Sequence, residues 1–257
     1  MPFDFCADRL QEARLSFESR AFDQAARGFK QALSACPQRD QILVSLGQTQ
    51  FLAGDEAGAE STLRLGLETN EKNTAARYAL GRIFYQQGRY PEAAAQLERV
   101  VELDPANYRA HDNLGLCYDL LQRDSEALKH FFRALDLVKV DHREYDWAYA
   151  NLAEFFLKRD QFDKAFPLAA EAAERNPNAA RNFFLAGQAL VKLGQPGNSL
   201  KWLRKAVELD PDHAEAHFQL GQALRTLGQA EEARSQLETF RSLKARAPSK
   251  PGPRSQP

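Results

Sequence analysis

Residues 79–105 read ALGRIFYQQGRYPEAAAQLERVVELDP, and the end of this stretch returns later in the chain. Residues 101–118 read VELDPANYRAHDNLGLCY, and residues 207–224 read VELDPDHAEAHFQLGQAL. Two such similar stretches in one chain indicate an internal repeat. Their starts, Val101 and Val207, lie 106 residues apart, which is not a multiple of a common repeat length.

Small residues give the period of this repeat. Ala59, Ala93 and Ala127 are spaced by 34 residues, and so are Gly47, Gly81 and Gly115. The register predicts seven units: 6–39, 40–73, 74–107, 108–141, 146–179, 180–213 and 214–247. Four additional residues, within about 138–145, account for the unequal separation. They lengthen either the second helix of the fourth unit or the loop after it.

Positions 8 and 20 of every unit are small, which predicts two antiparallel helices that cross closely. The residues at position 8 are Ala13, Gly47, Gly81, Gly115, Ala153, Gly187 and Gly221. Gly54, Gly88, Gly194 and Gly228 stand where a first helix would end, and Pro37, Pro105, Pro177 and Pro211 where a second helix would end. No run has strand periodicity, so the chain is predicted to be all-α.

A 34-residue helix pair with Leu-Gly, Tyr, Ala and Pro at these spacings resembles the tetratricopeptide repeat (TPR). The segments NLGLCY and EALKHFFRA of unit four and the stretch quoted first fit it best. The resemblance covers residues 6–247. It implies a right-handed α-solenoid of antiparallel helix pairs, a TPR superhelix. Glu12, Glu71 and Ser199 depart from the family pattern at single positions.

The ends of the array differ from its interior. Position 7, which should press on the preceding unit, is Leu or Ala in units two to seven but Glu12 in unit one. Position 28, which should press on the following unit, is apolar until Arg241. Because terminal units of a solenoid need polar outer faces, we expect a single complete array over residues 6–247. The Pro-rich tail 248–257 is expected to be disordered.

Composition bounds the function. The net charge is −1, which provides no electrostatic footprint for nucleic acid or an anionic membrane. No stretch is long and apolar enough to span a bilayer, and the start lacks an export signal. The three cysteines, Cys6, Cys36 and Cys117, are expected to be reduced thiols. A cytoplasmic location is expected, with export as the alternative if a signal has been removed.

No residue pattern indicates catalysis, a cofactor or a metal. His213 and His217 are four residues apart, but no third ligand is near them in sequence. His111 and His217 take a position that is usually aromatic in the family, which favours a packed imidazole. The chain has no phosphate loop and no nucleophile motif. We therefore expect a protein that is not an enzyme and needs no cofactor.

The resemblance implies that the first helices line a concave groove that binds a peptide or a partner helix. Positions 2, 5, 6, 9, 12 and 13 of each unit then face this groove. Applied to units three to seven, these positions give the candidate residues Tyr78, Arg82, Tyr85, Arg109, Asp112, Asn113, Trp147, Asn151, Phe184, Gln188, Phe218 and Gln222. Aromatic residues and arginine are enriched at binding hot spots. Trp147 and Phe184 have the alternative role of filling gaps between units.

Two features refine this prediction. Asn113 and Asn151 share position 6 and resemble an asparagine ladder that contacts a peptide backbone, the alternative being two solvated polar residues. Position 9 carries no lysine, so the family's clamp for a C-terminal carboxylate is not matched. The leading hypothesis is a protein-binding scaffold or adaptor, a monomer or weak homo-oligomer. A structural subunit of a secretion or pilus-assembly complex is the alternative, and single-stranded RNA binding is a third.

Overall fold

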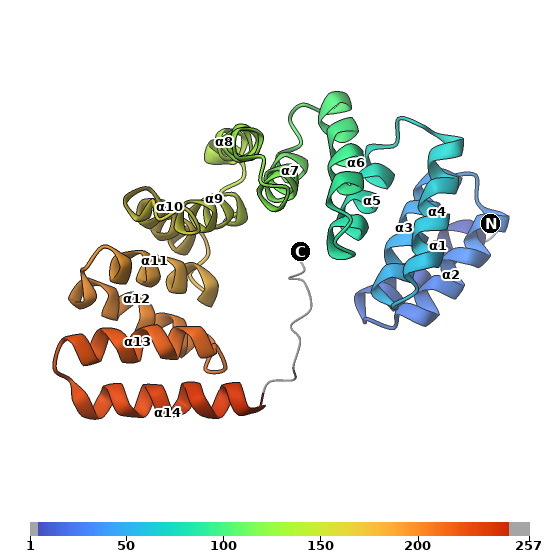
Figure 1. The fold of residues 1–257 in the computed structure, drawn as a ribbon. Coiled ribbons are helices and arrows are strands. Elements are labelled where there is room, and N and C mark those ends of the chain that lie inside the picture. Colours follow the sequence, from blue (N-terminus) through green and yellow to red (C-terminus); the bar gives the residue numbers. More distant parts are fainter. Residues whose placement is uncertain (1–4, 247–257) are drawn as a thin grey trace. The chain divides into compact units, whose positions relative to one another are not determined.

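The computed structural model describes residues 5–246, which form fourteen helices and no strand. The prediction of an all-α solenoid of helix pairs is confirmed. The predicted tail, 248–257, lies outside the described residues. The helices, labelled in Figure 1, are α1 (Phe5–Glu18), α2 (Phe22–Ala35), α3 (Arg39–Leu52), α4 (Glu56–Thr69), α5 (Thr74–Gln86), α6 (Tyr90–Leu103), α7 (Tyr108–Leu120), α8 (Asp124–Asp141), α9 (Trp147–Leu157), α10 (Phe162–Arg175), α11 (Ala180–Lys192), α12 (Pro196–Leu209), α13 (Ala214–Thr226) and α14 (Ala230–Arg246).

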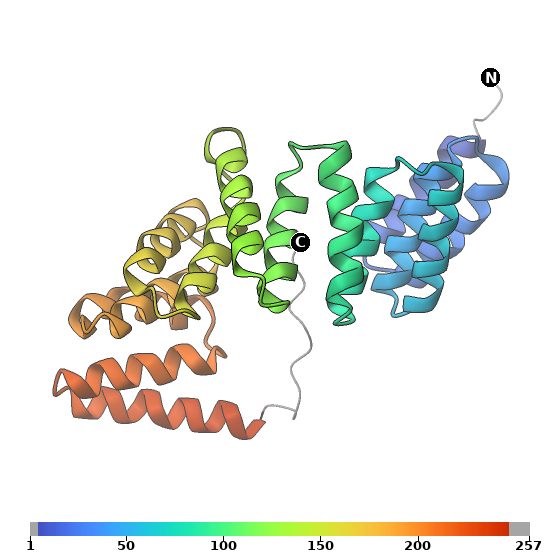
Figure 2. The same cartoon turned by 45° about the horizontal axis from the view of Figure 1, so that its top comes forward.

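The chain divides into two compact units, one ending at Arg123 and the other beginning at Asp124. Unit 1 contains α1–α7 and unit 2 contains α8–α14. These two compact units are larger than the 34-residue units of the sequence, which are called repeats from here on. In each unit the odd-numbered helices, here called first helices, alternate with the even-numbered second helices. Successive helices of a unit run antiparallel, which is clearest for α11–α14 (Figure 2).

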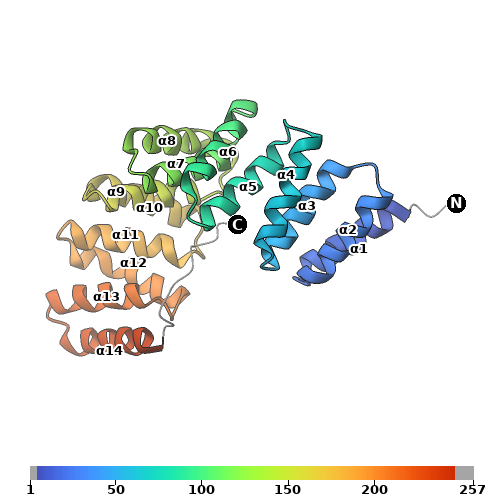
Figure 3. The same cartoon turned by 45° about the vertical axis from the view of Figure 1, so that its right-hand side comes forward.

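First helices also contact one another within a unit. The helix α3 packs on α5, and α5 packs on α7. In unit 2, α9 packs on α11 and α11 on α13, so each unit has a layer of first helices (Figure 3). The side chains on the outer surface of this layer are the candidates for binding.

A glycine at position 8 lets the two helices of a pair approach closely. A Cβ atom on Gly47, Gly81, Gly187 or Gly221 would lie 2.5, 2.7, 2.6 or 2.8 Å from the Cγ atom of a leucine on the following second helix. These leucines are Leu63, Leu97, Leu203 and Leu237. The predicted close crossing is therefore confirmed. The obstruction to a larger residue is this leucine, and position 20 contributes mainly a backbone carbonyl.

Position 15 ends every first helix in the left-handed region. Gly54, Gly88, Gly194 and Gly228 have φ between 73 and 86°, as their placement predicts. In the other three repeats, position 15 is Arg20, Gln122 or Asp160, with φ of 60, 58 and 56° respectively. Because an L side chain is strained there, these three positions are suboptimal for stability.

The surplus residues extend a helix. The helix α8 has 18 residues, whereas α6 and α10 have 14 each. The guanidinium of Arg175, on α10, holds the extended end by donating to the carbonyl of Val138 at 3.2 Å. It also donates to the Tyr149 hydroxyl at 2.9 Å and lies over that ring.

The expectation of three reduced cysteines is wrong for this structure. Cys6, in the first turn of α1, and Cys36, directly after α2, form a disulfide with Cα atoms 5.3 Å apart. Residues 30 apart in sequence meet because an antiparallel helix pair brings the start of its first helix beside the end of its second. Cys117 is free and buried on α7.

Candidate functional site

The first candidate cluster lies on α5 and α7 of unit 1. Tyr78 and Arg82 are one turn apart on α5, and Arg109, Asp112 and Asn113 belong to the first half of α7. The Asn113 amide donates to the Tyr78 hydroxyl at 3.2 Å and to the carbonyl of Arg109 at 2.8 Å. The structure thus brings five predicted residues together around one phenol.

Charges around Tyr78 act in both directions on its phenol. Burial raises the pKa of Tyr78, and the Asp112 carboxylate adds to this increase. The positive charges of Arg82 and Arg109 and the hydrogen bond from Asn113 oppose it. The net pKa is raised, so the phenol is neutral at physiological pH and can both donate and accept a hydrogen bond.

Asn113 and Asn151 are buried, with 3% and 2% of their surface exposed. Asn113 uses its amide to hold Tyr78, and Asn151 accepts a hydrogen bond from Arg181. Both readings of the sequence, a peptide-contacting ladder and two solvated residues, require exposed amides. In this structure the two asparagines instead position their neighbours.

A cavity of about 470 Å³ opens beside Tyr78 on the first-helix layer of unit 1. The helix α5 lines it with Tyr78, Ala79, Arg82, Ile83 and Gln86. The helices α1 and α3, with the turn after α1, line the rest of it with Phe17, Arg20, Gln48, Phe51 and Leu52. Only Tyr78 and Arg82 among these were predicted from the sequence. The prediction of groove residues covered the third to seventh repeats, although Gln48 and Leu52 hold positions 9 and 13 of the second repeat.

Tyr85 is placed apart from this cavity. Its ring makes an edge contact with Tyr90 of α6, with the ring centroids 5.6 Å apart. Tyr85 is half-buried, so part of the ring remains on the surface of α5.

The second candidate cluster lies in unit 2 and centres on Arg181, in the first turn of α11. Its Nη2 atom donates to Asn151 at 2.9 Å and to Glu154 at 2.7 Å, both on α9. Its guanidinium lies over the ring of Trp147, 5.0 Å from the centroid. The Nε atom of Arg181 is buried and has no hydrogen-bond partner among the described residues.

Sequence reasoning missed Arg181, although a signal for it existed. Arg181 takes position 2 of the sixth repeat, as Arg109 does in the fourth repeat, and Arg109 was predicted. Trp147 and Asn151 were predicted, and the structure joins both to this arginine. Applying the 34-residue register to position 2 of every repeat would have identified Arg181.

The remaining predicted residues are spread over α11 and α13. Phe184 is partly buried against the cluster that contains Leu203 and Leu220, and its ring lies 4.6 Å from that of His213. Phe218 contacts Phe240, with centroids 5.0 Å apart. Gln222 accepts a hydrogen bond from Arg225 at 2.5 Å, and Gln188 is half-buried on α11. Phe184 therefore has a packing role, as its alternative interpretation holds.

The histidines have structural partners. The ring nitrogens of His217 lie 2.7 Å from Gln236 and 3.0 Å from the carbonyl of Pro211. His213 accepts from the Ala216 amide and so caps α13. Across residues 5–246, no group of three His, Cys, Asp or Glu side chains is arranged to hold a metal ion. Burial raises the pKa of the Cys117 thiol to about 12, which keeps that thiol protonated.

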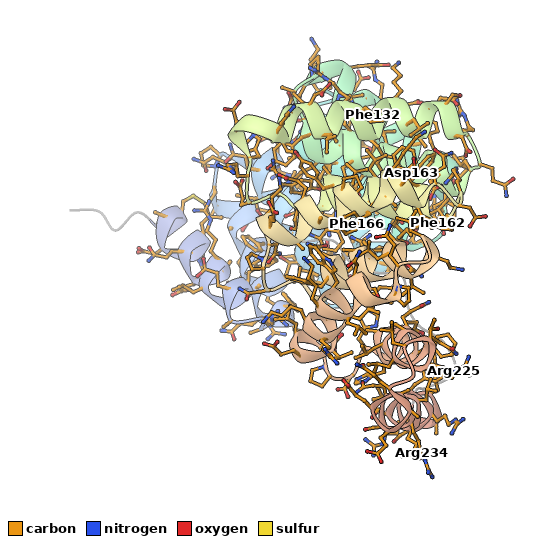
Figure 4. All side chains as sticks on the ribbon, turned by 90° about the vertical axis from the view of Figure 1, so that its left-hand side faces the viewer. Phe132, Phe162, Asp163, Phe166, Arg225 and Arg234 are labelled. Atoms are coloured by element: carbon orange, nitrogen blue, oxygen red, sulfur yellow. A yellow bond between two sulfur atoms is a disulfide. The ribbon has the colours of Figure 1, made fainter. Side chains whose placement is uncertain are left out.

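The second helices of unit 2 carry a separate set of aromatic side chains. Phe132, on α8, is 46% exposed, and Phe162 and Phe166 lie one turn apart on α10 (Figure 4). The ring of Phe166 makes an edge contact with Trp202 of α12. This surface is the main rival to the first-helix layer as a binding face.

Two family models match the chain, a tetratricopeptide repeat model over residues 78–142 and a TPR repeat model over residues 172–236. This chain belongs to the tetratricopeptide repeat family. The matched segments come from both units, and the fold agrees with solved structures of tetratricopeptide repeat proteins. TPR arrays generally serve as protein–protein interaction scaffolds.

Individual relatives are distant. The TPR chain is 29% identical over 120 residues to tetratricopeptide repeat-containing protein trd-1 of Caenorhabditis elegans, covering 46% of this chain and 15% of that protein. The chain therefore spans less than a fifth of that relative's length. No helix within residues 5–246 has the length and hydropathy needed to cross a membrane.

Two solved structures illustrate the likeness of fold. The chain matches the APC/C hetero-tetramer Cut9–Hcn1 with a TM-score of 0.74 and 19% identity, over 86% of this chain and 43% of that one. It matches YrrB, described as a TPR protein with an unusual peptide-binding site, with a TM-score of 0.57 and 22% identity. That match covers 72% of this chain and 93% of YrrB.

Proposed function

We propose that this TPR chain is a non-catalytic adaptor that binds an extended segment or a helix of a partner protein along its first-helix layer. The observation that carries the proposal is the cavity of about 470 Å³ on this layer, which includes the independently predicted Tyr78 and Arg82. Concave sites with an apolar lining and a few fixed polar groups are typical of ligand recognition. The peptide-binding site of YrrB, a protein of similar fold, supports the same function.

The partner in this proposal is a protein rather than RNA. Single-stranded RNA needs a basic groove with stacking side chains. In unit 2 the half-buried ring of Trp147 is already covered by Arg181, and the charge of that arginine is balanced by Glu154 at 2.7 Å. The balanced charge favours recognition by shape and hydrogen bonds over recognition of phosphates.

The compartment also belongs to the proposal. Disulfides persist in oxidising compartments and are rare in the cytoplasm. The Cys6–Cys36 bond therefore favours the exported alternative over the expected cytoplasmic location.

The test is an affinity capture from lysate of the source cells with three baits. The first is wild type, the second carries Tyr78→Ala and Trp147→Ala, and the third carries Phe132→Ala and Phe162→Ala on the second-helix face. Each variant must first match wild type in helicity and melting temperature. We expect the partner to be captured by the first and third baits and lost from the second. Loss from the third bait alone would move recognition to the second-helix face and contradict the proposal.

A further inference from the structure

The disulfide between Cys6 and Cys36 fastens a helix that has little other burial. Among residues 6–18 of α1, Ala13 is the only fully buried residue. The next first helix, α3, has seven buried residues and packs on α2, α4 and α5. Within the described part of the chain, α1 packs extensively on α2 alone, at the end of unit 1 (Figure 3). The position of α1 therefore depends on few buried contacts.

The other contacts of α1 are with the same helix, α2. Ala13 belongs to the core of the first repeat, and Leu10 and Phe17 are partly buried against that core. Arg9 donates a hydrogen bond to Gln31 of α2. A helix of 14 residues is marginal in water without packing. When its contacts with α2 open, α1 therefore undocks and unfolds as one element.

The disulfide opposes this undocking. It joins the first turn of α1 to the residue directly after α2 and so closes a loop with a sequence separation of 30. Closing a loop of this length lowers the conformational entropy of the chain in which α1 is undocked. The intact bond thus favours the docked helix, and breaking the bond favours undocking.

The other end of α1 contributes to the cavity beside Tyr78. Phe17, on the last turn of α1, and Arg20, in the turn after it, line this cavity. The amide of Arg20 donates to the carbonyl of Phe17 at 3.0 Å, so the two residues move together. Undocking of α1 removes both from the cavity and leaves only the side chains of α3 and α5.

The two sulfur atoms differ in access to solvent. Cys36 is buried, with 6% of its surface exposed, whereas Cys6 is half-buried. Cys6 lines a separate surface cavity of about 370 Å³, together with the exposed Gln11, Arg14 and Gln38. Because exchange depends on which sulfur a thiolate can reach, a small thiol attacks Cys6 first.

We propose that the Cys6–Cys36 disulfide is a redox switch, opened by attack of a small thiol on Cys6, and that its reduction undocks α1 and dismantles the cavity beside Tyr78. The proposal rests on the proposed function, because the cavity that the switch controls is the candidate binding site. The oxidised chain binds the partner, and the reduced chain binds it weakly. Recognition is then confined to a compartment in which the disulfide persists.

The reductant is a thiol of the glutathione class, RSH. Its thiolate attacks Sγ of Cys6, the bond to Cys36 breaks, and the Cys36 thiolate takes a proton from water. A second RSH, as its thiolate, attacks the R sulfur of the mixed disulfide on Cys6. This step releases RSSR and leaves Cys6 as a thiol after protonation. The protein disulfide gains two electrons, and two molecules of RSH are oxidised to one RSSR.

The first part of the test is hydrogen exchange measured by mass spectrometry on the full chain, with and without dithiothreitol. We expect reduction to lower the protection of α1 amides by about tenfold or more and to leave α5 unchanged. The internal control is α14, a terminal helix with one buried residue, Ala233, and no cysteine. Its exchange should be the same in both states.

Two variants separate the bond from other effects of the reductant. Cys6→Ser with Cys36→Ser should match the reduced wild type whether or not dithiothreitol is present. Cys117→Ala keeps the disulfide and should respond to the reductant as wild type does. Unchanged exchange of α1 on reduction, with α5 and α14 intact, would overturn the proposal.

The second part identifies the attacked sulfur. Wild type is incubated with glutathione, and free thiols are then trapped with iodoacetamide. We expect the glutathione adduct on Cys6 and the alkyl group on Cys36, both read from peptide masses. An adduct found on Cys36 instead would overturn the attack at Cys6.

The third part measures binding with defined probes. A cysteine-free library of random dodecapeptides is panned on the oxidised chain, and peptides that also bind Tyr78→Ala are discarded. We expect the dissociation constants of the remaining peptides to rise about tenfold or more on reduction. Equal affinities in the two redox states would overturn the switch and leave the proposed function intact. If α1 lost protection but no peptide depended on Tyr78, the switch at α1 would be supported and the proposed function contradicted.

Discussion

Arg181 of α11 donates a hydrogen bond of 2.9 Å to the buried Asn151 of α9 and so links the first helices of two consecutive pairs. The same guanidinium contacts Glu154 and Trp147. Because each repeat packs only on its neighbours, a residue such as Arg181 that joins two first helices affects both the stability of the array and the shape of the first-helix layer.

The first prediction concerns this link. Arg181→Met removes the donor to Asn151 and Glu154 while keeping an apolar stem over Trp147. We expect the free energy of unfolding to fall by about 1–3 kcal/mol, since the buried Asn151 loses one hydrogen bond and the half-buried Glu154 loses one ion pair. Urea denaturation measures this change. Arg234→Met, on an arginine side chain that is 82% exposed, should change the free energy by less than about 0.5 kcal/mol. Equal effects of the two substitutions would show that the link contributes no stability.

The second prediction concerns the close crossing of α5 and α6. Gly81→Ala places a methyl group 2.7 Å from Cγ of the buried Leu97 and 3.4 Å from the carbonyl of Ala93. Overpacking of this kind typically costs about 1–3 kcal/mol. Gly197→Ala is the control, since a Cβ there meets nothing within 4 Å, and it should be neutral or slightly stabilising. Thermal and urea unfolding of both variants would decide, and an unaffected Gly81→Ala protein would refute the crossing geometry.

The third prediction uses the left-handed residue at position 15. Gln122 is exposed and has a φ of 58°, so Gln122→Gly should raise the free energy of unfolding by about 0.5–1 kcal/mol. Gln87, whose φ is −77°, is the matched control. Gln87→Gly should destabilise by about the same amount, because glycine adds backbone entropy to the unfolded chain. Opposite signs for the two variants are the expected result of urea titrations, and equal signs would contradict the assignment.

The fourth prediction counts thiols. The chain has three cysteines, two of which are joined as Cys6–Cys36. Ellman's reagent should find no reactive thiol in the native protein, because burial raises the pKa of Cys117 to about 12. It should find one thiol after denaturation without reductant and three after reduction. Three thiols in the denatured, unreduced protein would restore the expectation of free cysteines.

The fifth prediction concerns pH. Burial alone would raise the pKa of Glu60, but hydrogen bonds from Arg64 and Arg89 outweigh it, so the pKa is lowered from 4.5. A lowered pKa stabilises the fold above the unfolded pKa and loses this contribution as the pH falls through the folded value. Wild type should therefore melt above Glu60→Gln at neutral pH, and the difference should shrink as the solution is acidified below pH 4.5. A constant difference across this range in thermal melts would rule out the ion pairs as its cause.

The sequence predicted the helix pairs because the residues responsible for them act locally. A glycine with positive φ ends the first helix in four of the seven repeats, and position 8 is Gly or Ala in all seven, so both positions leave a recurring signal in the sequence. A period of 34 residues then needs only counting.

The candidate site was predicted less completely because its side chains come from neighbouring repeats and contact one another only in the folded protein. The aromatic and arginine positions followed from the register, but the burial of Asn113 and Asn151 depends on which side chains cover them. The cavity is lined by side chains from α1, α3 and α5, which belong to three different repeats, so no single repeat contains its pattern. The disulfide was missed because sequence distance was weighed instead of the antiparallel geometry of one helix pair.

The most direct measurement of the central claim is site-specific photo-cross-linking. The photoreactive residue p-benzoylphenylalanine replaces Tyr78 on the first-helix layer in one protein, and Phe132 on the second-helix face in another. Both are irradiated in lysate of the source cells, and cross-linked peptides are sequenced by mass spectrometry. The account predicts a partner segment cross-linked from position 78 and absent from position 132. Cross-links from position 132 alone would contradict it and would place recognition on the second helices.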